Sequence, residues 1–153
     1  MRQTLTVLLL SAAIILAWGL WGFFGKLALN RQMAPLAIYL AEVAVSVAVG
    51  CLAVAIVLRM GQAPPWQAAL NLFGLLSGVG MAVGLLLFYI ALAYGKAVVI
   101  VPLTATYPLV TVLLSYLFLG ERPGAVQWLG IALVVSGGAL LLSGPIFAGE
   151  GSG

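Results

Sequence analysis

Residues 36–58 read LAIYLAEVAVSVAVGCLAVAIVL and contain one formally charged side chain, Glu42. A run of about 20 apolar residues is long enough to cross the hydrocarbon core of a bilayer as an α-helix. The chain is 65% hydrophobic and 6% charged, which is too little charge for a water-soluble surface. The sequence therefore predicts an all-α integral membrane protein with five transmembrane helices, at about 5–24, 36–58, 68–92, 97–119 and 125–142.

The connections between these helices are short and contain turn-forming residues, as in Arg59–Pro65 and Gly120–Gly124. Short connections make sequential helices antiparallel neighbours and leave no room for a soluble domain. We therefore expect residues 1–144 to form one transmembrane unit. Residues 145–153 are rich in glycine and are expected to form a flexible tail.

The composition excludes several kinds of site. The chain has no histidine, no aspartate and one cysteine, Cys51, so no His/Cys metal site and no intrachain disulfide can form. No cofactor is indicated, and the predicted helices lack the carboxylate pairs or nucleophile and base sets of enzymes. The net charge of +3 reflects few acids rather than a basic cluster, so nucleic acid is not an expected partner.

Glu42 is the first candidate for a functional residue. Insertion scales assign roughly 2.5 to 3.5 kcal/mol to a charged side chain at mid-membrane, and such residues usually mark substrate, ion or proton pathways. Glu42 lies about 9 Å along its predicted helix, and helical spacing places Tyr39 and Ser46 on the same face. Lys26, at the same side of the membrane, is its expected charge partner. The alternative is a structural Glu42–Lys26 pair, or a snorkelling carboxylate, with no transport role.

The fourth predicted helix contains two prolines, Pro102 and Pro108. Each removes a backbone donor and frees a carbonyl one turn earlier, and such breaks in lipid are tolerated where they line a cavity. Thr104, Tyr107 and Thr111 share a predicted face with Pro108 and are expected to line a polar path. The alternative is that the hydroxyl groups bond to carbonyls of their own helix.

Two indoles, Trp18 and Trp21, lie at helical spacing near the end of the first segment. Aromatic faces attract cations, more strongly where water is excluded, so these residues are candidates for a wall against a cationic or amphipathic substrate. The alternative is that they anchor the helix at an interface.

The cations are divided evenly between the two sides of the membrane. Because an excess of Lys and Arg in short loops sets orientation, an even count predicts dual topology and an inverted homodimer. The alternatives are a single orientation set by Arg2, or a second half-size chain as partner. With five crossings the two groups are Arg2, Arg59 and Arg122 on one side, and Lys26, Arg31 and Lys96 on the other.

Three stretches carry a resemblance to a known family: Phe88–Leu92, Pro102–Leu109 and Leu117–Arg122. Together with Trp18-Gly19 and the closing helix Gln127–Leu133, they resemble the EamA family of the drug/metabolite transporter superfamily. Most members of that family resemble two five-helix units in one chain around a central cavity. This chain supplies one unit, so the resemblance implies a second, inverted copy.

The stretch Ala41-Glu42-Val43 is similar to the sequence around the membrane glutamate of the small multidrug resistance proteins, which extends a proton-linked role to Glu42. The resemblance implies a multi-pass transporter of the cell (inner) membrane that exports metabolites or amphipathic compounds by alternating access. The expected partners are membrane lipid, a small-molecule substrate and a second copy of the chain. The alternatives are a lipid-linked sugar flippase subunit, or a non-transporting accessory membrane subunit.

Overall fold

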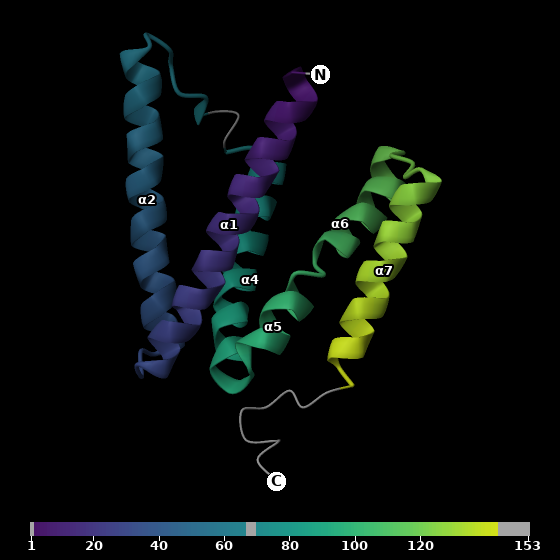
Figure 1. Cartoon of the computed structure of the whole chain (residues 1–153). Helices are drawn as coiled ribbons and strands as arrows, with labels where there is room; N and C mark the ends of the chain where they lie inside the picture. The colour runs from purple at the N-terminus through teal and green to yellow at the C-terminus, as the bar shows by residue number, and fades with distance from the viewer. Residues whose placement is uncertain (1, 67–69, 144–153) are drawn as a thin grey trace. The chain divides into compact units, whose positions relative to one another are not determined.

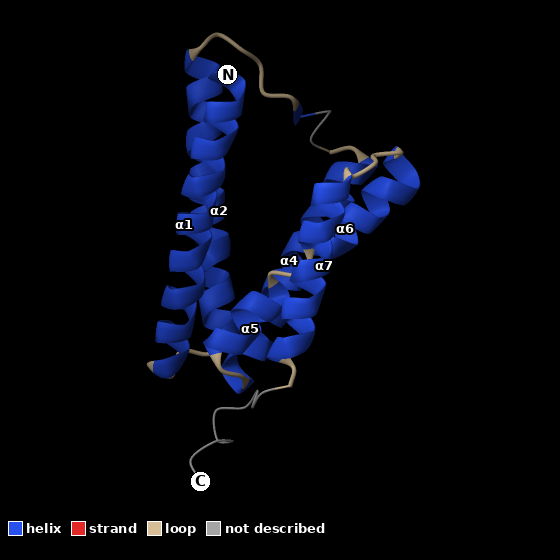
Figure 2. Cartoon of the chain, turned by 45° about the vertical axis from the view of Figure 1, so that its right-hand side comes forward, coloured by secondary structure: helices blue, strands red, loops and turns tan. Residues whose placement is uncertain are grey.

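The computed structural model describes residues 2–66 and 70–143. Within these residues the secondary-structure elements are all helical (Figure 1, Figure 2). The expected start of the third helix at residue 68 and the expected tail at 145–153 lie outside the described residues. The elements are α1 (Arg2–Asn30), α2 (Pro35–Arg59), α4 (Leu72–Tyr94), α5 (Ala97–Thr104), α6 (Pro108–Leu114), the π-helical turn η1 (Ser115–Leu119) and α7 (Ala125–Leu141).

Four helical segments of the described chain are long and apolar enough to cross a membrane. The mean hydropathies of these segments lie between 2.1 and 2.5. Helices α5 and α6 and the turn η1 together form the fourth segment. Helix α7 has 17 residues and is about 26 Å long, near the lower limit for a crossing. The predicted fold class, an all-α membrane protein, is confirmed. The four segments are Thr4–Asn30, Pro35–Arg59, Leu72–Tyr94 and Ala97–Leu119.

Helix α1 continues to Asn30, past the end predicted at residue 24. The helix continues past residue 24 because a lysine with a long apolar stem fits a helix near the headgroups, and the leucines and alanines that follow favour helix. The helix stops where Gln32 adopts a left-handed conformation with φ 64°. There the Met33 N–H donates to the Ala28 carbonyl at 3.2 Å, a Schellman-type end.

Helix α4 has a side-chain cap at its N-terminus. The Asn71 side-chain oxygen accepts a hydrogen bond from the Gly74 N–H at 2.8 Å. This bond satisfies one of the backbone donors that have no partner within the first helical turn. The cap explains why the regular helix begins at Leu72.

The fourth crossing is interrupted at residues 105–107, between α5 and α6. Pro108 has no N–H to donate to the Thr104 carbonyl, and the Tyr107 N–H donates to that carbonyl instead, at 3.0 Å. Pro102 lies inside α5 without ending it. The helix break therefore lies next to Pro108, and Pro102 does not form a second break.

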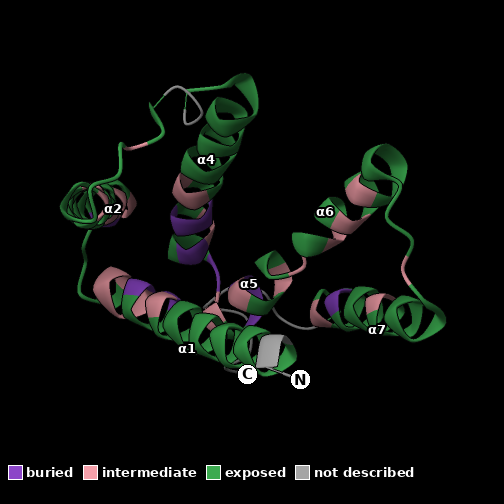
Figure 3. Cartoon of the chain, turned by 90° about the horizontal axis from the view of Figure 1, so that it is seen from above, coloured by how far each residue is buried: buried purple, intermediate pink, exposed green. Residues whose placement is uncertain are grey.

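The described residues group into two compact units. Among the described residues, the central unit lies within 24–93, and the terminal unit combines 2–23 with 94–143. Few side chains are buried in either (Figure 3), and the long apolar helices otherwise expose their side chains, as expected for surfaces that face lipid. The buried hydrophobic side chains are Ile38, Phe88, Tyr89 and Leu92 in the central unit, and Val99 and Ile100 in the terminal unit.

Candidate functional site

Glu42 and Tyr89 are hydrogen-bonded within the central unit. The Tyr89 hydroxyl, on α4, donates to a carboxylate oxygen of Glu42 on α2. Tyr89 has no exposed surface, whereas Glu42 is half-buried. A tyrosine hydroxyl inside apolar surroundings needs a polar partner, and a carboxylate inside a membrane protein needs a donor. Each group therefore satisfies the requirement of the other.

A glycine on α1 makes room for the Tyr89 ring. A Cβ atom built on Gly25 would lie 2.8 Å from Cε1 and 3.2 Å from the hydroxyl oxygen of Tyr89. These distances are shorter than van der Waals contact, and the nearest atom belongs to a rigid aromatic ring. The phenol of Tyr89 is thus enclosed between the backbone of α1 and the carboxylate on α2.

Lys26 approaches the same helix. Its ammonium group donates a hydrogen bond to the Leu92 carbonyl of α4 at 2.9 Å. Leu92 follows Tyr89 by three residues, which places both on one face of the helix. The carboxylate of Glu42 and the ammonium of Lys26 therefore converge on a single face of α4, one turn apart. Their assignment as a charge pair remains a prediction.

The three polar groups lie at graded depths along their helices. Measured from the helix ends at this side of the membrane, Lys26 lies about 6 Å in, Tyr89 about 8 Å and Glu42 about 10 Å. All three are therefore within the depth of one leaflet, with the cation nearest the surface.

The other residues predicted to lie beside Glu42 differ in their exposure. Tyr39 is half-buried on α2, whereas Ser46, one turn deeper than Glu42, is exposed. The polar side chains on this side of α2 thus extend from the buried Tyr89 contact to a surface that the single chain leaves uncovered. Their role in binding substrate stays a prediction.

Two predicted site residues come together in the terminal unit. The rings of Trp18 on α1 and Tyr107 in the 105–107 turn have centroids 6.4 Å apart with planes inclined at 48°. Both side chains are more than half exposed, at 56% and 53%. They form an accessible aromatic pair beside the helix break. Trp21 is half-buried on the same helix.

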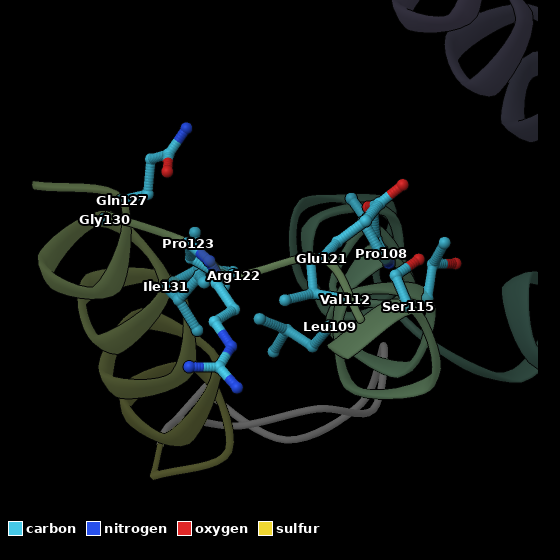
Figure 4. Close-up of a pocket in the computed structure, with 13 residues that line it drawn as sticks. Pro108, Leu109, Val112, Ser115, Glu121, Arg122, Pro123, Gln127, Gly130 and Ile131 are labelled. Carbon is cyan, nitrogen blue, oxygen red and sulfur yellow. The ribbon is translucent and has the colours of Figure 1, made fainter. Parts of the chain in front are cut away.

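The polar residues of the fourth crossing do not share one continuous helical face, because the 105–107 turn separates Thr104 from Thr111. The Thr104 hydroxyl donates to carbonyls of its own helix, to Ile100 at 2.8 Å and to Val101 at 3.0 Å. This is the alternative that the sequence left open for hydroxyls in this segment. Pro108 and Thr111 instead line a groove between α6 and α7 (Figure 4).

Tyr89 was not identified as a site residue from the sequence. It belongs to the Phe88–Leu92 stretch that carried the family resemblance, yet no polar partner for it could be named. The available signal was its hydroxyl group in the middle of an apolar run, since such a group requires a hydrogen-bond acceptor. Among the described residues, no three His, Cys, Asp or Glu side chains gather as a metal site.

Comparison with known proteins gives the family. Residues 5–143 match the EamA-like transporter family. This chain belongs to that family. The EamA match spans α1 to the end of α7 and so includes both the Glu42–Tyr89 pair and the Trp18–Tyr107 pair. The protein is therefore a membrane protein of a transporter family, which agrees with the expectation that it is not an enzyme.

Two relatives have nearly the same length as the chain. An uncharacterized protein of Methanocaldococcus jannaschii is 31% identical over 136 residues, covering 89% of this chain and 96% of the relative. An uncharacterized transporter in the cobO 3′ region of Sinorhizobium sp. is 30% identical over 139 residues, covering 87% and 92%. No solved structure gives a significant match. The chain therefore covers nearly the full length of both relatives.

Proposed function

We propose that this EamA-family chain is one half of a proton-coupled exporter of small amphipathic compounds or metabolites, acting in the cell (inner) membrane as an inverted homodimer by alternating access. The observation that carries the proposal is the hydrogen bond from Tyr89 to the half-buried carboxylate of Glu42. A carboxylate kept inside a membrane segment is costly, and its retention marks a pathway for protons or substrate.

Glu42 has the properties that exchange of a proton for a substrate requires. Its carboxylate accepts a hydrogen bond from Tyr89, and it can accept a proton or pair with a cationic group instead. A substrate and a proton compete for this one carboxylate. When the site opens to each side of the membrane in turn, export of the substrate is therefore coupled to import of a proton. Tyr89 holds the carboxylate in place while neither is bound.

Further residues extend the proposed path toward the substrate. The exposed ring pair of Trp18 and Tyr107 offers aromatic faces to a cationic or apolar group of the substrate. Tyr39 and Ser46 add hydroxyl groups on the helix that carries Glu42. Thr111 adds a hydroxyl group beside the helix break. A substrate that used both the carboxylate of Glu42 and these aromatic faces would be an amphipathic cation rather than an anion.

The proposed dimer rests on chain length and on charge. The chain covers 96% of the Methanocaldococcus jannaschii relative and 92% of the Sinorhizobium relative, so all three are similar in length. An even count of cations on the two sides supports insertion in both orientations. Two inverted copies give the pseudo-two-fold symmetry on which many transporters alternate access.

The test of coupling uses purified protein in proteoliposomes with an imposed pH gradient. Uptake of a cationic amphipath is measured for the wild type, for Glu42→Gln and for Glu121→Gln, whose carboxylate lies in the turn before α7. We expect Glu42→Gln to lose gradient-driven uptake and Glu121→Gln to keep it. If Glu42→Gln transports with unchanged pH dependence, proton coupling through Glu42 is wrong.

The test of orientation uses C-terminal reporters that are active on opposite sides of the membrane. Dual topology predicts signal from both reporters, and Lys96→Gln, which changes the count to three cations against two, is expected to shift the population toward one orientation. Signal from one reporter alone in the wild type would exclude the inverted homodimer.

A further inference from the structure

A groove runs between two helices of the terminal unit, and neither Glu42 nor Tyr89 is among the residues that line it. Its volume is about 660 Å³, and it separates α6 and η1 from α7 (Figure 4). Apolar side chains form most of its walls, with Leu109 and Val112 on one side and Ile131 and Val134 on the other. The groove is open, so its apolar walls are accessible from outside the protein.

A cation lies at one end of this groove. Arg122, in the turn between η1 and α7, extends its guanidinium group into the space between the two helices (Figure 4). The neighbouring Glu121 also lines the groove. Within residues 2–66 and 70–143, the structure contains no ion pair or hydrogen bond to the Arg122 side chain. The positive charge is therefore available to a ligand in the groove.

The length of the groove matches one leaflet of a bilayer. Along α7 it extends from the turn at Arg122 to Val134, which lies about 14 Å beyond the first residue of the helix, Ala125. The hydrocarbon core of a bilayer is about 30 Å thick. The groove thus reaches from the headgroup layer to the middle of the membrane, the depth that one acyl chain occupies.

An aromatic pair marks the headgroup level at the same end. The rings of Tyr116 and Trp128 meet edge to face, with centroids 6.0 Å apart and planes inclined at 74°. Tyrosine and tryptophan favour the boundary between headgroups and hydrocarbon. Arg122 lies between these two residues in the sequence, so a headgroup layer at their level would bring lipid phosphates close to its turn.

We infer that this groove binds one anionic phospholipid, with an acyl chain along Leu109, Val112 and Ile131 and the lipid phosphate on Arg122. Guanidinium groups bind phosphate through paired hydrogen bonds, and basic pockets between membrane helices bind anionic headgroups. The groove shares Thr111 with the proposed substrate path but does not include Glu42, and binding of a lipid in it does not require the proposed transport activity.

The experiment measures lipid retention by the purified full-length protein. Delipidated protein in detergent is titrated with phosphatidylglycerol or phosphatidylcholine, and bound lipid is counted by native mass spectrometry. We expect the wild type to retain phosphatidylglycerol about fivefold more tightly than phosphatidylcholine, the preference that one favourably placed cation provides. Arg122→Gln is expected to lose the preference, and Arg122→Lys to keep most of it.

Two further variants distinguish the effect of the Arg122 charge from the effect of the space in the groove. Arg59→Gln removes a cation from the end of α2, outside the groove, and is expected to keep the wild-type preference. Ile131→Trp fills the groove and is expected to weaken retention of both lipids. The inference is overturned if Arg122→Gln and the wild type show the same preference, or if Ile131→Trp retains both lipids as tightly as the wild type. Thermal unfolding without lipid verifies that each variant is folded.

Discussion

Tyr89 on α4 donates its hydroxyl hydrogen to the carboxylate of Glu42 on α2, 47 residues away in the sequence. The phenol ring is fully buried, and the backbone at Gly25 lies against it. The position of the carboxylate is therefore set by packing between three helix segments rather than by α2 alone. Changes at Tyr89 or Gly25 should act on Glu42 without touching it.

Tyr89→Phe is expected to destabilise the protein and to lower transport. A hydrogen bond to a charged group contributes roughly 1.5 to 3 kcal/mol, and its loss leaves the Glu42 carboxylate with one donor fewer. The measurement is thermal unfolding in detergent, with uptake in proteoliposomes as the second readout. The control is Tyr94→Phe, at the exposed end of the same helix, where the side chain is 71% exposed. Equal effects of both variants would contradict the role of the Tyr89 hydroxyl.

Gly25→Ala is expected to destabilise the protein by about 1 to 3 kcal/mol, because the new methyl group overlaps the Tyr89 ring and forces it to shift. The matched control is Gly19→Ala on the same helix, where the added Cβ meets no atom within 4 Å. The unfolding midpoint in detergent reports the difference. A Gly25→Ala protein as stable as Gly19→Ala would show that Tyr89 can move without cost.

Gly138→Leu is expected to weaken the packing of α7 against the 105–107 turn. A Cβ at Gly138 would lie 3.3 Å from the Thr106 methyl carbon, so a longer side chain has no space there. The adjacent variant Gly137→Leu adds the same side chain where nothing lies within 4 Å. Limited proteolysis and thermal unfolding should show a loss of stability in Gly138→Leu alone. Equal stability of the two variants would contradict this packing.

Trp18→Ala is expected to raise KM for a cationic amphipath by roughly two- to tenfold, because cation-π and aromatic contacts contribute on the order of 0.5 to 1.5 kcal/mol. The measurement is concentration-dependent uptake in proteoliposomes, compared with a neutral compound of similar size. Trp66→Ala, in the connection before α4, serves as the control. An equal rise for the cationic and the neutral compound would rule out a cation-π role for Trp18.

Apolar length was sufficient to predict much of the fold from the sequence. Helix α2 extends one residue beyond its predicted range at each end, and the fourth crossing occupies residues 97–119 as expected. The prolines indicated an interruption in that crossing. Its location could not be derived, because Pro102 and Pro108 each remove a donor and the surrounding contacts decide which loss can be tolerated within a helix.

The candidate site could be predicted only in part. Glu42 stands out because a charge in an apolar run is rare, and Trp18 and Tyr107 stand out as aromatic residues near helix ends or breaks. Tyr89 does not stand out, because its importance comes from a partner on another helix. Periodicity shows which residues share a face of one helix, but the pairing of faces depends on tertiary packing.

The small number of buried side chains has a consequence for how the protein can be studied. Only Tyr89 and Leu92 are fully enclosed among the described large side chains, so most apolar contacts must come from lipid or from another copy. Binding of either to the folded chain adds to its apparent stability by mass action. Dilution into detergent therefore changes the unfolding midpoint itself, and values for two variants are comparable only at the same ratio of protein to lipid.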